Sequence, residues 1–155
     1  PKPHIKRNDL IKVLGENIEL LKKFDNTINF NIDNKIGKKA IINFDNEQFN
    51  RLIFNLLKNS IESIQEKSKK TSNLLKNIDI EINQRRDYIT LNILDTGEGF
   101  RDKKTKDIIK PYFTTKEKGT GLGLSIVDKI INDHNGSIKF LNTKKGAKVQ
   151  IIIPK

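Results

Sequence analysis

Cysteine, methionine and tryptophan are absent from this chain of 155 residues. Without cysteine there can be no disulfides, thiolate metal sites or cysteine nucleophiles. The two histidines, His4 and His134, are too few for a multi-histidine zinc site. No apolar run approaches the roughly 20 residues that span a bilayer, and no N-terminal apolar stretch resembles a signal peptide. The remaining possibility is an ordinary globular chain, long enough for one domain and 32% charged.

Acidic residues are fewer than basic ones: the chain has 19 Asp and Glu against 30 Lys and Arg, which gives a net charge of +11. Such a balance can favour polyanions. The lysines are spread along the whole chain, however, and aromatic residues make up only 6% of it. We therefore expect no specific nucleic-acid partner. The lack of methionine and the opening Pro1 predict a piece of a longer protein.

Apolar spacing predicts three helices, with apolar faces at about 10–21, 49–64 and 124–134. Alternating or short apolar runs predict strands at 27–32, 39–44, 78–82, 88–94, 137–141 and 148–153. The polar stretch 63–77 is expected to be a frayed helix end and a loop. Candidate helix caps are Asn8 or Asp9, then Asp45 or Asn46, and the last helix should stop at 135–136 with Gly136 left-handed. This order predicts an α+β fold, a mixed and mainly antiparallel sheet with helices on one face.

A long irregular connection, from Gly97 to about Gly121, interrupts this pattern. Connections of this length in a compact domain are usually lids or binding loops. It begins with Asp95-Thr96-Gly97-Glu98-Gly99, directly after an apolar strand, where glycines let the backbone approach a ligand. Asp-Thr-Gly can also simply form a turn. An aspartic protease would need a second Asp-Thr-Gly or a dimer, and no second copy exists.

The connection ends in Gly119-Thr120-Gly121-Leu122-Gly123, which continues into a helix. Backbone N–H groups at a helix N-terminus form a site for anions such as a triphosphate. The spacing matches neither the dinucleotide fingerprint nor a P-loop. Lys116 and Lys118 precede it and could reach phosphate.

Asn55 and Asn59 lie one turn apart on the middle helix, at the edge of its apolar face, and Glu62 extends the stripe. Two carboxamides there could hold a hydrated divalent cation through an oxygen ligand. Asparagine is common in this chain, so two surface asparagines are an equally simple interpretation.

Four strings occur in order: Asn55-Leu56-Leu57-Lys58-Asn59, Asp95 to Phe100, Pro111-Tyr112-Phe113-Thr114-Thr115-Lys116, and Gly119 to Leu124. Together they resemble the N, G1, F and G2 boxes of the catalytic and ATP-binding domain of sensor histidine kinases. This domain belongs to a superfamily with gyrase B, Hsp90 and MutL. The residues of the last two strings are most similar to those of the nitrogen-regulation NtrY/NtrB-like subgroup. The resemblance covers about 10–153. It implies the Bergerat fold, a two-layer α/β sandwich with three helices on one face of the sheet. Residues 1–9 would be a residual linker, and 10–155 the catalytic domain with an ATP lid at about 100–118.

The resemblance also implies roles for single residues. Asp95 would accept a hydrogen bond from the adenine amino group, and Asn59 would coordinate Mg²⁺, with Asn55 beside it. The catalytic residues it implies are Asn55, Asn59 and Lys116. The nucleotide-binding residues it implies are Asn59, Asp95, Gly97, Gly99, Phe113, Thr115, Lys116, Gly119, Thr120, Gly121, Leu122 and Gly123.

One departure concerns the superfamily's ATP hydrolysis. Members of the superfamily that hydrolyse ATP have, at the position of Asn55, a glutamate that activates water. Asn55 has no useful basicity near pH 7. The resemblance therefore implies ATP held for in-line phosphoryl transfer to a histidine on a separate dimerisation domain. Neither His4 nor His134 lies in the family's phosphoacceptor context. We therefore expect this chain alone to bind Mg-ATP and not to autophosphorylate.

The resemblance further implies a downstream response regulator, a homodimeric parent protein and a monomeric fragment. It implies a cytoplasmic domain whose parent is anchored in a bacterial inner membrane. Alternatives are a protein serine kinase of the anti-sigma-factor type, or a nucleotide-binding module without transfer activity. A basic nucleic-acid-binding domain would leave the glycines unexplained.

Overall fold

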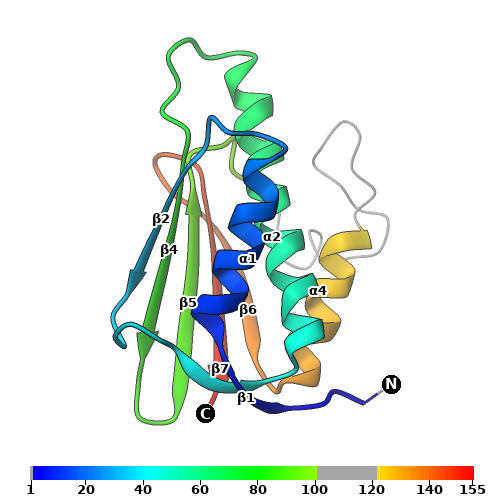
Figure 1. Cartoon of the computed structure of the whole chain (residues 1–155). Coiled ribbons are helices and arrows are strands. Elements are labelled where there is room, and N and C mark those ends of the chain that lie inside the picture. Colours follow the sequence, from blue (N-terminus) through cyan, green and yellow to red (C-terminus); the bar gives the residue numbers. More distant parts are fainter. Residues whose placement is uncertain (1, 101–121) are drawn as a thin grey trace.

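A computed structural model describes residues 2–100 and 122–155 (Figure 1). The elements in chain order are β1 (Lys6–Asp9), α1 (Leu10–Lys22), β2 (Asn29–Asn34), β3 (Ile41–Phe44), α2 (Asn46–Ser68), β4 (Asn77–Gln84), β5 (Tyr88–Asp95), α4 (Leu122–Asp133), β6 (Ser137–Asn142) and β7 (Ala147–Pro154). Among these residues, no helix combines the length and apolarity needed to cross a membrane.

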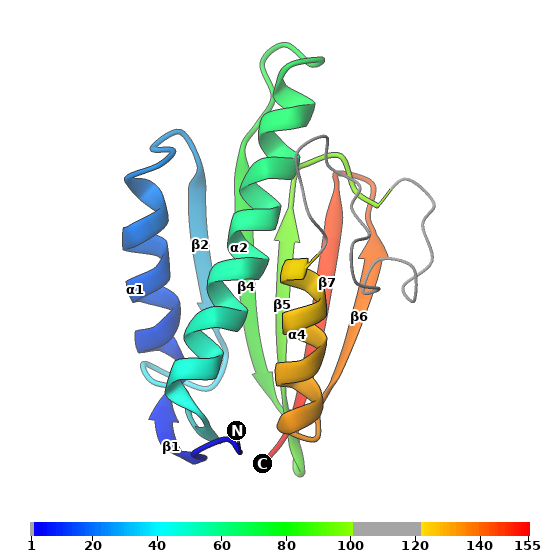
Figure 2. The ribbon, with the colours of Figure 1, turned by 90° about the vertical axis from the view of Figure 1, so that its right-hand side faces the viewer.

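Five strands form the main sheet, in the order β2-β4-β5-β7-β6. β2 runs parallel to β4, and the other three pairs are antiparallel. The three helices lie on one face of this sheet (Figures 1 and 2). The predicted two-layer α+β sandwich, with a mixed and mainly antiparallel sheet, is therefore confirmed.

The core lies between the sheet and α2, the central helix. Every second residue of the inner strands is apolar and buried, since neighbouring side chains on a strand point to opposite faces. The buried strand residues are Ile78, Ile80 and Ile82, then Ile89, Leu91 and Ile93, then Val149, Ile151 and Ile153. α2 contributes Leu52, Ile53, Leu56 and Leu57, none more than 2% exposed. Each such side chain stabilises the fold by about 1.5–3 kcal/mol through burial.

The N-terminal strand is part of this fold. β1 pairs antiparallel with β3 in a separate two-stranded sheet. Asp9 caps α1, as one of the two candidate caps predicted, because its Oδ1 accepts from Ile11 N at 3.1 Å. The same oxygen accepts from Ala40 N at 2.9 Å. Residues 6–9 of the stretch 1–9, which the sequence suggested as a linker, are thus paired with the domain.

The central helix is longer than the sequence predicted. Asp45 caps it, accepting from Gln48 N at 3.0 Å, and the helix continues to Ser68. The helix end and loop expected over 63–77 therefore begin later, since α2 is regular to Ser68 and the loop follows it. Gln65 donates to Asp25 and Lys67 to the Lys145 carbonyl oxygen, so the last turns are held by tertiary contacts, which override weak local preference.

The end of α4 also differs from the expectation. The left-handed residue is Asn135, with φ of 56°, and Gly136 does not have positive φ. Asparagine is the usual substitute for glycine at this C-terminal position. Glycine is needed at 136 for another reason, because a Cβ there would lie 2.6 Å from the Ile152 carbonyl oxygen.

Candidate functional site

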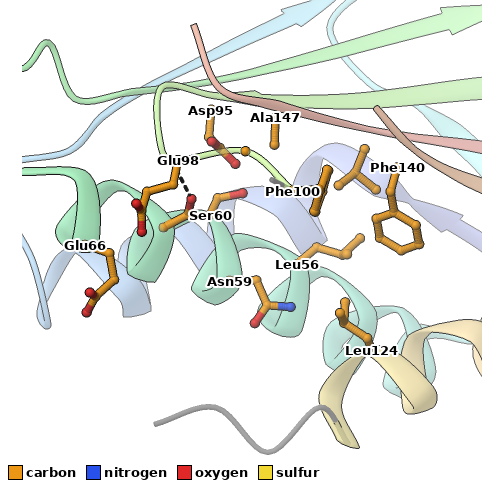
Figure 3. A pocket seen from close by; sticks show the side chains of 13 residues that line it. Leu56, Asn59, Ser60, Glu66, Asp95, Glu98, Phe100, Leu124, Phe140 and Ala147 are labelled. Carbon is orange, nitrogen blue, oxygen red and sulfur yellow. Dashed lines mark hydrogen bonds between the residues drawn. The ribbon is translucent and has the colours of Figure 1, made fainter. Parts of the chain in front are cut away.

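One pocket opens between α2, the start of α4, the loop after β5 and strands β6 and β7 (Figure 3). Its lining has an apolar part and a polar part. The lining residues are Leu56, Asn59, Ser60, Ser63, Glu66, Asp95, Glu98, Gly99, Phe100, Leu124, Phe140, Ala147 and Val149. Phe100 and Phe140 form one wall, with ring centroids 5.6 Å apart in a T-shaped arrangement.

Asp95 ends β5 at the inner end of this pocket, with only 6% of its surface exposed. Its Oδ1 accepts from the Gly97 N–H at 2.8 Å. Burial raises the pKa of Asp95, because a charged carboxylate loses hydration there. The Gly97 N–H, the nearby Ser60 hydroxyl and Ala147 N–H, and the Lys67 charge oppose the rise. The result is a poorly hydrated carboxylate, a strong acceptor for an N–H donor in the pocket.

The glycines of the loop allow its close packing. A Cβ on Gly97 would lie 2.8 Å from the backbone carbonyl carbon of Ser63 on α2. Gly99 has φ of +78°, and a Cβ there would lie 2.8 Å from Asn142 Oδ1. Gly146, between β6 and β7, packs directly on the Asp95 carbonyl oxygen. The loop is therefore pressed between α2 and the β6–β7 hairpin, with no room for larger residues.

Polar side chains at positions 63 and 67 of α2 and at position 70 just beyond it hold this loop and the neighbouring β6–β7 hairpin. Ser63 Oγ accepts from the Glu98 N–H at 2.8 Å, and Lys67 Nζ donates to the Lys145 carbonyl oxygen at 3.0 Å. Lys70 pairs with Glu98 at 3.2 Å. Sequence reasoning missed these three residues. Ser63 and Lys67 lie four apart and so share one face of α2, and that spacing was the available signal.

The two asparagines differ in position. Asn59 lines the pocket, as its predicted role requires (Figure 3). Asn55, one turn earlier, is half-buried and is not among the lining residues. Among the residues described, no three His, Asp or Glu side chains gather as a metal site. Any cation here would need further oxygen ligands from a bound molecule or from water.

The remaining sequence-predicted residues lie at or beyond the limits of the description. Phe113, Thr115, Lys116, Gly119, Thr120 and Gly121 are outside the described residues, as is the expected lid from 101 onwards. Leu122 and Gly123 belong to the first turn of α4. The structure thus brings together Asn59, Asp95 and Gly99 around one pocket, with Gly97 directly behind it.

His134 belongs to the scaffold. Its Nδ1 lies 2.8 Å from the Ile130 carbonyl oxygen, and its Nε2 accepts from the Asp45 N–H at 3.0 Å. These partners require a neutral ring with the proton on Nδ1. The ring is 5% exposed and packs on Phe49, with centroids 4.7 Å apart. His134 therefore packs the end of α4 against the start of α2.

The arrangement suits a planar heterocycle with an amino group and a polar tail. The apolar walls can enclose the ring, Asp95 can accept from its amino group, and Asn59 offers an amide toward the tail. Pockets with apolar walls and few polar groups are typical of small-molecule sites.

Comparisons with known proteins agree with this geometry. The model of the family described as histidine kinase-, DNA gyrase B-, and HSP90-like ATPase matches residues 44–155. The chain is 31% identical to a putative NtrY-like sensor histidine kinase of Rickettsia bellii and 34% identical to sporulation kinase A of Bacillus subtilis. These matches cover 96% and 95% of this chain, and 23% of each relative. A nucleotide-free catalytic domain of the histidine kinase ThkA superposes with a TM-score of 0.82 at 26% identity, covering 98% of both chains.

Proposed function

The chain belongs to the family of histidine kinase-, DNA gyrase B- and HSP90-like ATPases, and on that premise we propose that its pocket binds Mg-ATP for phosphoryl transfer to a histidine. The acceptor histidine would lie on a separate dimerisation domain. The relatives are named as sensor histidine kinases and sporulation kinases, which favours histidine over the serine acceptor of the alternative. The chain spans 23% of the first two relatives' length, so the acceptor domain would lie in the remainder of the parent protein.

The single observation that carries this proposal is the buried carboxylate of Asp95, which lines a pocket with apolar walls. A buried carboxylate discriminates strongly between ligands, because a ligand without a matching donor leaves it unpaired. The adenine amino group is such a donor. Gly97 and Gly99 keep the loop thin where the base would lie.

The residues present fit a magnesium ion that arrives with the nucleotide. Mg²⁺ keeps several waters and typically uses one or two protein ligands together with substrate phosphates. Asn59 is a suitable single ligand, and Asn55 could support it from the preceding turn. When bound, the ion would neutralise charge on the phosphates and hold them in one geometry.

The side chains of this chain favour transfer over hydrolysis. Asn55 cannot take a proton from water near pH 7, so it cannot act as the base that hydrolysis needs. The chain would instead bind the base at Asp95, orient the phosphates near Asn59 and exclude water with its apolar wall. Lys116 and the glycines at 119, 121 and 123 would complete the phosphate site.

We further propose the surroundings of this domain. The parent protein would be a homodimeric sensor kinase, with a response regulator as the final acceptor. On the similarity to NtrY and NtrY-like sensor histidine kinases, we propose a membrane-anchored parent with this domain in the cytoplasm.

The binding half of the proposal is tested by calorimetric titration of ATP and GTP, each with and without magnesium. We expect saturable binding of Mg-ATP, much weaker binding of GTP, and a stabilisation of about 2.7 kcal/mol at 100 times Kd. A folded sample that binds neither nucleotide would overturn the assignment of the pocket.

The transfer half is tested with γ-labelled ATP and the dimerisation domain of the same gene, added as a separate chain. We expect label on that domain that is stable to alkali and lost in acid, as for phosphohistidine. Acid-stable label would instead indicate a serine acceptor. If the chain binds nucleotide but the dimerisation domain takes up no label, the chain is a nucleotide-binding module without transfer activity.

A further inference from the structure

The loop after β5 is hydrogen-bonded at two points to side chains that are distant from it in sequence. On the α2 side, Ser63 Oγ accepts from the Glu98 N–H at 2.8 Å. On the hairpin side, Asn142 Oδ1 accepts from the Phe100 N–H at 2.7 Å. The two pairs are separated by 35 and 42 residues along the chain. The loop is therefore held from both sides, by the central helix and by the end of β6.

We propose that Asn142 is a positioning residue, whose amide oxygen holds Phe100 in place as the aromatic wall against which the base of a bound nucleotide lies. This inference rests on the proposed function, because it takes an adenine nucleotide as the ligand. Asn142 lies outside the four sequence strings and is not among the residues that line the pocket. It acts on the ligand only through Phe100.

Phe100 is the group through which this effect reaches the pocket. Its side chain is half-buried, lines the pocket and meets the ring of Phe140 in a T-shaped pair. Figure 3 shows the two rings next to each other, both among the lining residues. Edge-to-face pairs are favoured by the charge distribution of the rings, so this pair has a preferred orientation. A wall that is already fixed in its bound orientation raises affinity, because less entropy is lost when the ligand binds.

Gly99 makes the position of Phe100 depend on Asn142. The bond from Ser63 fixes the loop as far as Glu98, and the next residue is Gly99, with φ of +78°. Glycine has the freest backbone of all residues, so a bond before it does not fix the residue after it. A Cβ on Gly99 would lie 2.8 Å from Asn142 Oδ1, which shows how closely the loop bends around this side chain.

Asn142 itself projects from a rigid hairpin. It ends β6, where it pairs with Ala147 of β7. In the turn that follows, Thr143 N donates to the Gly146 carbonyl oxygen at 2.8 Å, and Gly146 N donates to Thr143 Oγ1 at 3.0 Å. Gly146 also packs directly on the end of β5. The acceptor for Phe100 is thus held by the sheet, as a residue that positions a binding site requires.

The test is the affinity for Mg-ADP, measured by calorimetry on wild type, Asn142→Ala and Asn142→Asp. Alanine removes the acceptor, so Phe100 is no longer held and binding should weaken about fivefold, the usual effect of one hydrogen bond. Aspartate keeps an oxygen at the same position and should bind within about twofold of wild type. Urea unfolding shows that each variant is folded before its affinity is compared.

A matched control separates this effect from the loss of any surface amide. Asn31 is also an exposed asparagine with a side-chain hydrogen bond, since its Nδ2 donates to Asp79 Oδ1 at 3.0 Å. It lies on β2, at the opposite edge of the sheet from β6. Asn31→Ala should bind Mg-ADP as wild type does. The inference is overturned if Asn142→Ala also binds as wild type does, or if Asn142→Asp loses as much affinity as Asn142→Ala.

A second measurement does not depend on nucleotide. NMR of the free protein can follow both the exchange of the Phe100 amide hydrogen and the contacts between the Phe100 and Phe140 rings. In Asn142→Ala we expect faster exchange and weaker ring contacts, and in Asn142→Asp we expect the wild-type pattern. An unchanged pattern in Asn142→Ala would overturn the inference. If wild type binds no Mg-ADP, the proposed function fails, and these spectra still decide whether Asn142 positions Phe100.

Discussion

Two aspartates, each almost fully buried, serve opposite purposes in this domain. Asp45 is 7% exposed and Asp95 is 6% exposed. Burial disfavours the charged form of both. At Asp45 that effect is outweighed by N–H donors from Gln48, His4 and Glu47, so the pKa falls. At Asp95 the donors do not outweigh burial, and the pKa rises.

The difference lies in where the carboxylate oxygens point. Asp45 has one oxygen on Gln48 N at 3.0 Å and the other on His4 N at 2.7 Å, so both are used by the fold. Asp95 borders a pocket. Equal burial therefore tells little about function, and the balance of donors tells much more. A carboxylate left short of donors beside a cavity is a candidate ligand contact.

The largest effect among the substitutions is expected for Asp95→Asn. An amide presents an N–H₂ group where the adenine amino group needs an acceptor, so Mg-ATP binding should fall about 100-fold. The stability of the free protein should not fall, because a poorly hydrated charge is removed. Calorimetry and urea unfolding measure the two effects. A variant that binds normally would contradict the role of Asp95.

The converse change, Asp45→Ala, should harm stability and spare binding. Loss of the α2 cap, together with its bond to His4 N, should lower the free energy of unfolding by about 2 kcal/mol. Asp45→Asn keeps an acceptor and should cost less. The check is urea unfolding beside Mg-ATP titration of the folded variant. A large loss of affinity with intact folding would show that the two sites are not separate.

The pH dependence of stability sharpens the contrast. The lowered pKa of Asp45 supplies stability that is present above its unfolded pKa and lost as pH falls through the folded value. The raised pKa of Asp95 acts the other way, and its cost appears as pH rises from the unfolded to the folded value. Urea unfolding from pH 3 to pH 8 should therefore show that Asp45→Asn loses most free energy of unfolding, relative to wild type, above pH 4. Over the same range the free energy of unfolding of Asp95→Asn should increase relative to wild type as pH rises. Curves that run parallel for the two variants would refute the contrast.

The smallest effect is expected at Lys70→Met. Lys70 pairs with Glu98 at 3.2 Å, but its side chain is 61% exposed. Exposed ion pairs are typically worth less than about 1 kcal/mol. The free energy of unfolding should change by less than about 0.5 kcal/mol, and Mg-ATP affinity by less than about twofold. A larger loss of affinity would show that this exposed ion pair contributes to nucleotide binding.

Much of the fold was predictable, because its signals are local. The alternating Ile78, Ile80 and Ile82 indicated a strand, and the apolar face of α2 indicated a helix. The strand β1 was missed because its four residues, Lys-Arg-Asn-Asp, are polar and its partner β3 is more than 30 residues away. The length of α2 was missed because serine and lysine are stabilised there by tertiary contacts.

The candidate site was predictable only where glycine or asparagine spacing marks it. Asn59, Asp95 and Gly99 were identified, and they meet at one pocket. Ser63 carries no motif, since a serine on a helix is an ordinary surface residue. Its hydrogen bond with the Glu98 N–H, 35 residues further along the chain, is revealed only by the folded arrangement.

The parallel pair β2–β4 has a consequence for how the domain assembles. Its register joins Asn29 to Asn77, so the chain must first traverse β3 and α2 before this edge can close. The hairpins β4–β5 and β6–β7 close over short turns and cost far less entropy. Pairing that is distant in sequence slows folding. We therefore expect β2 to join the sheet late, and its amide hydrogens to exchange with solvent sooner than those of the central strand β5.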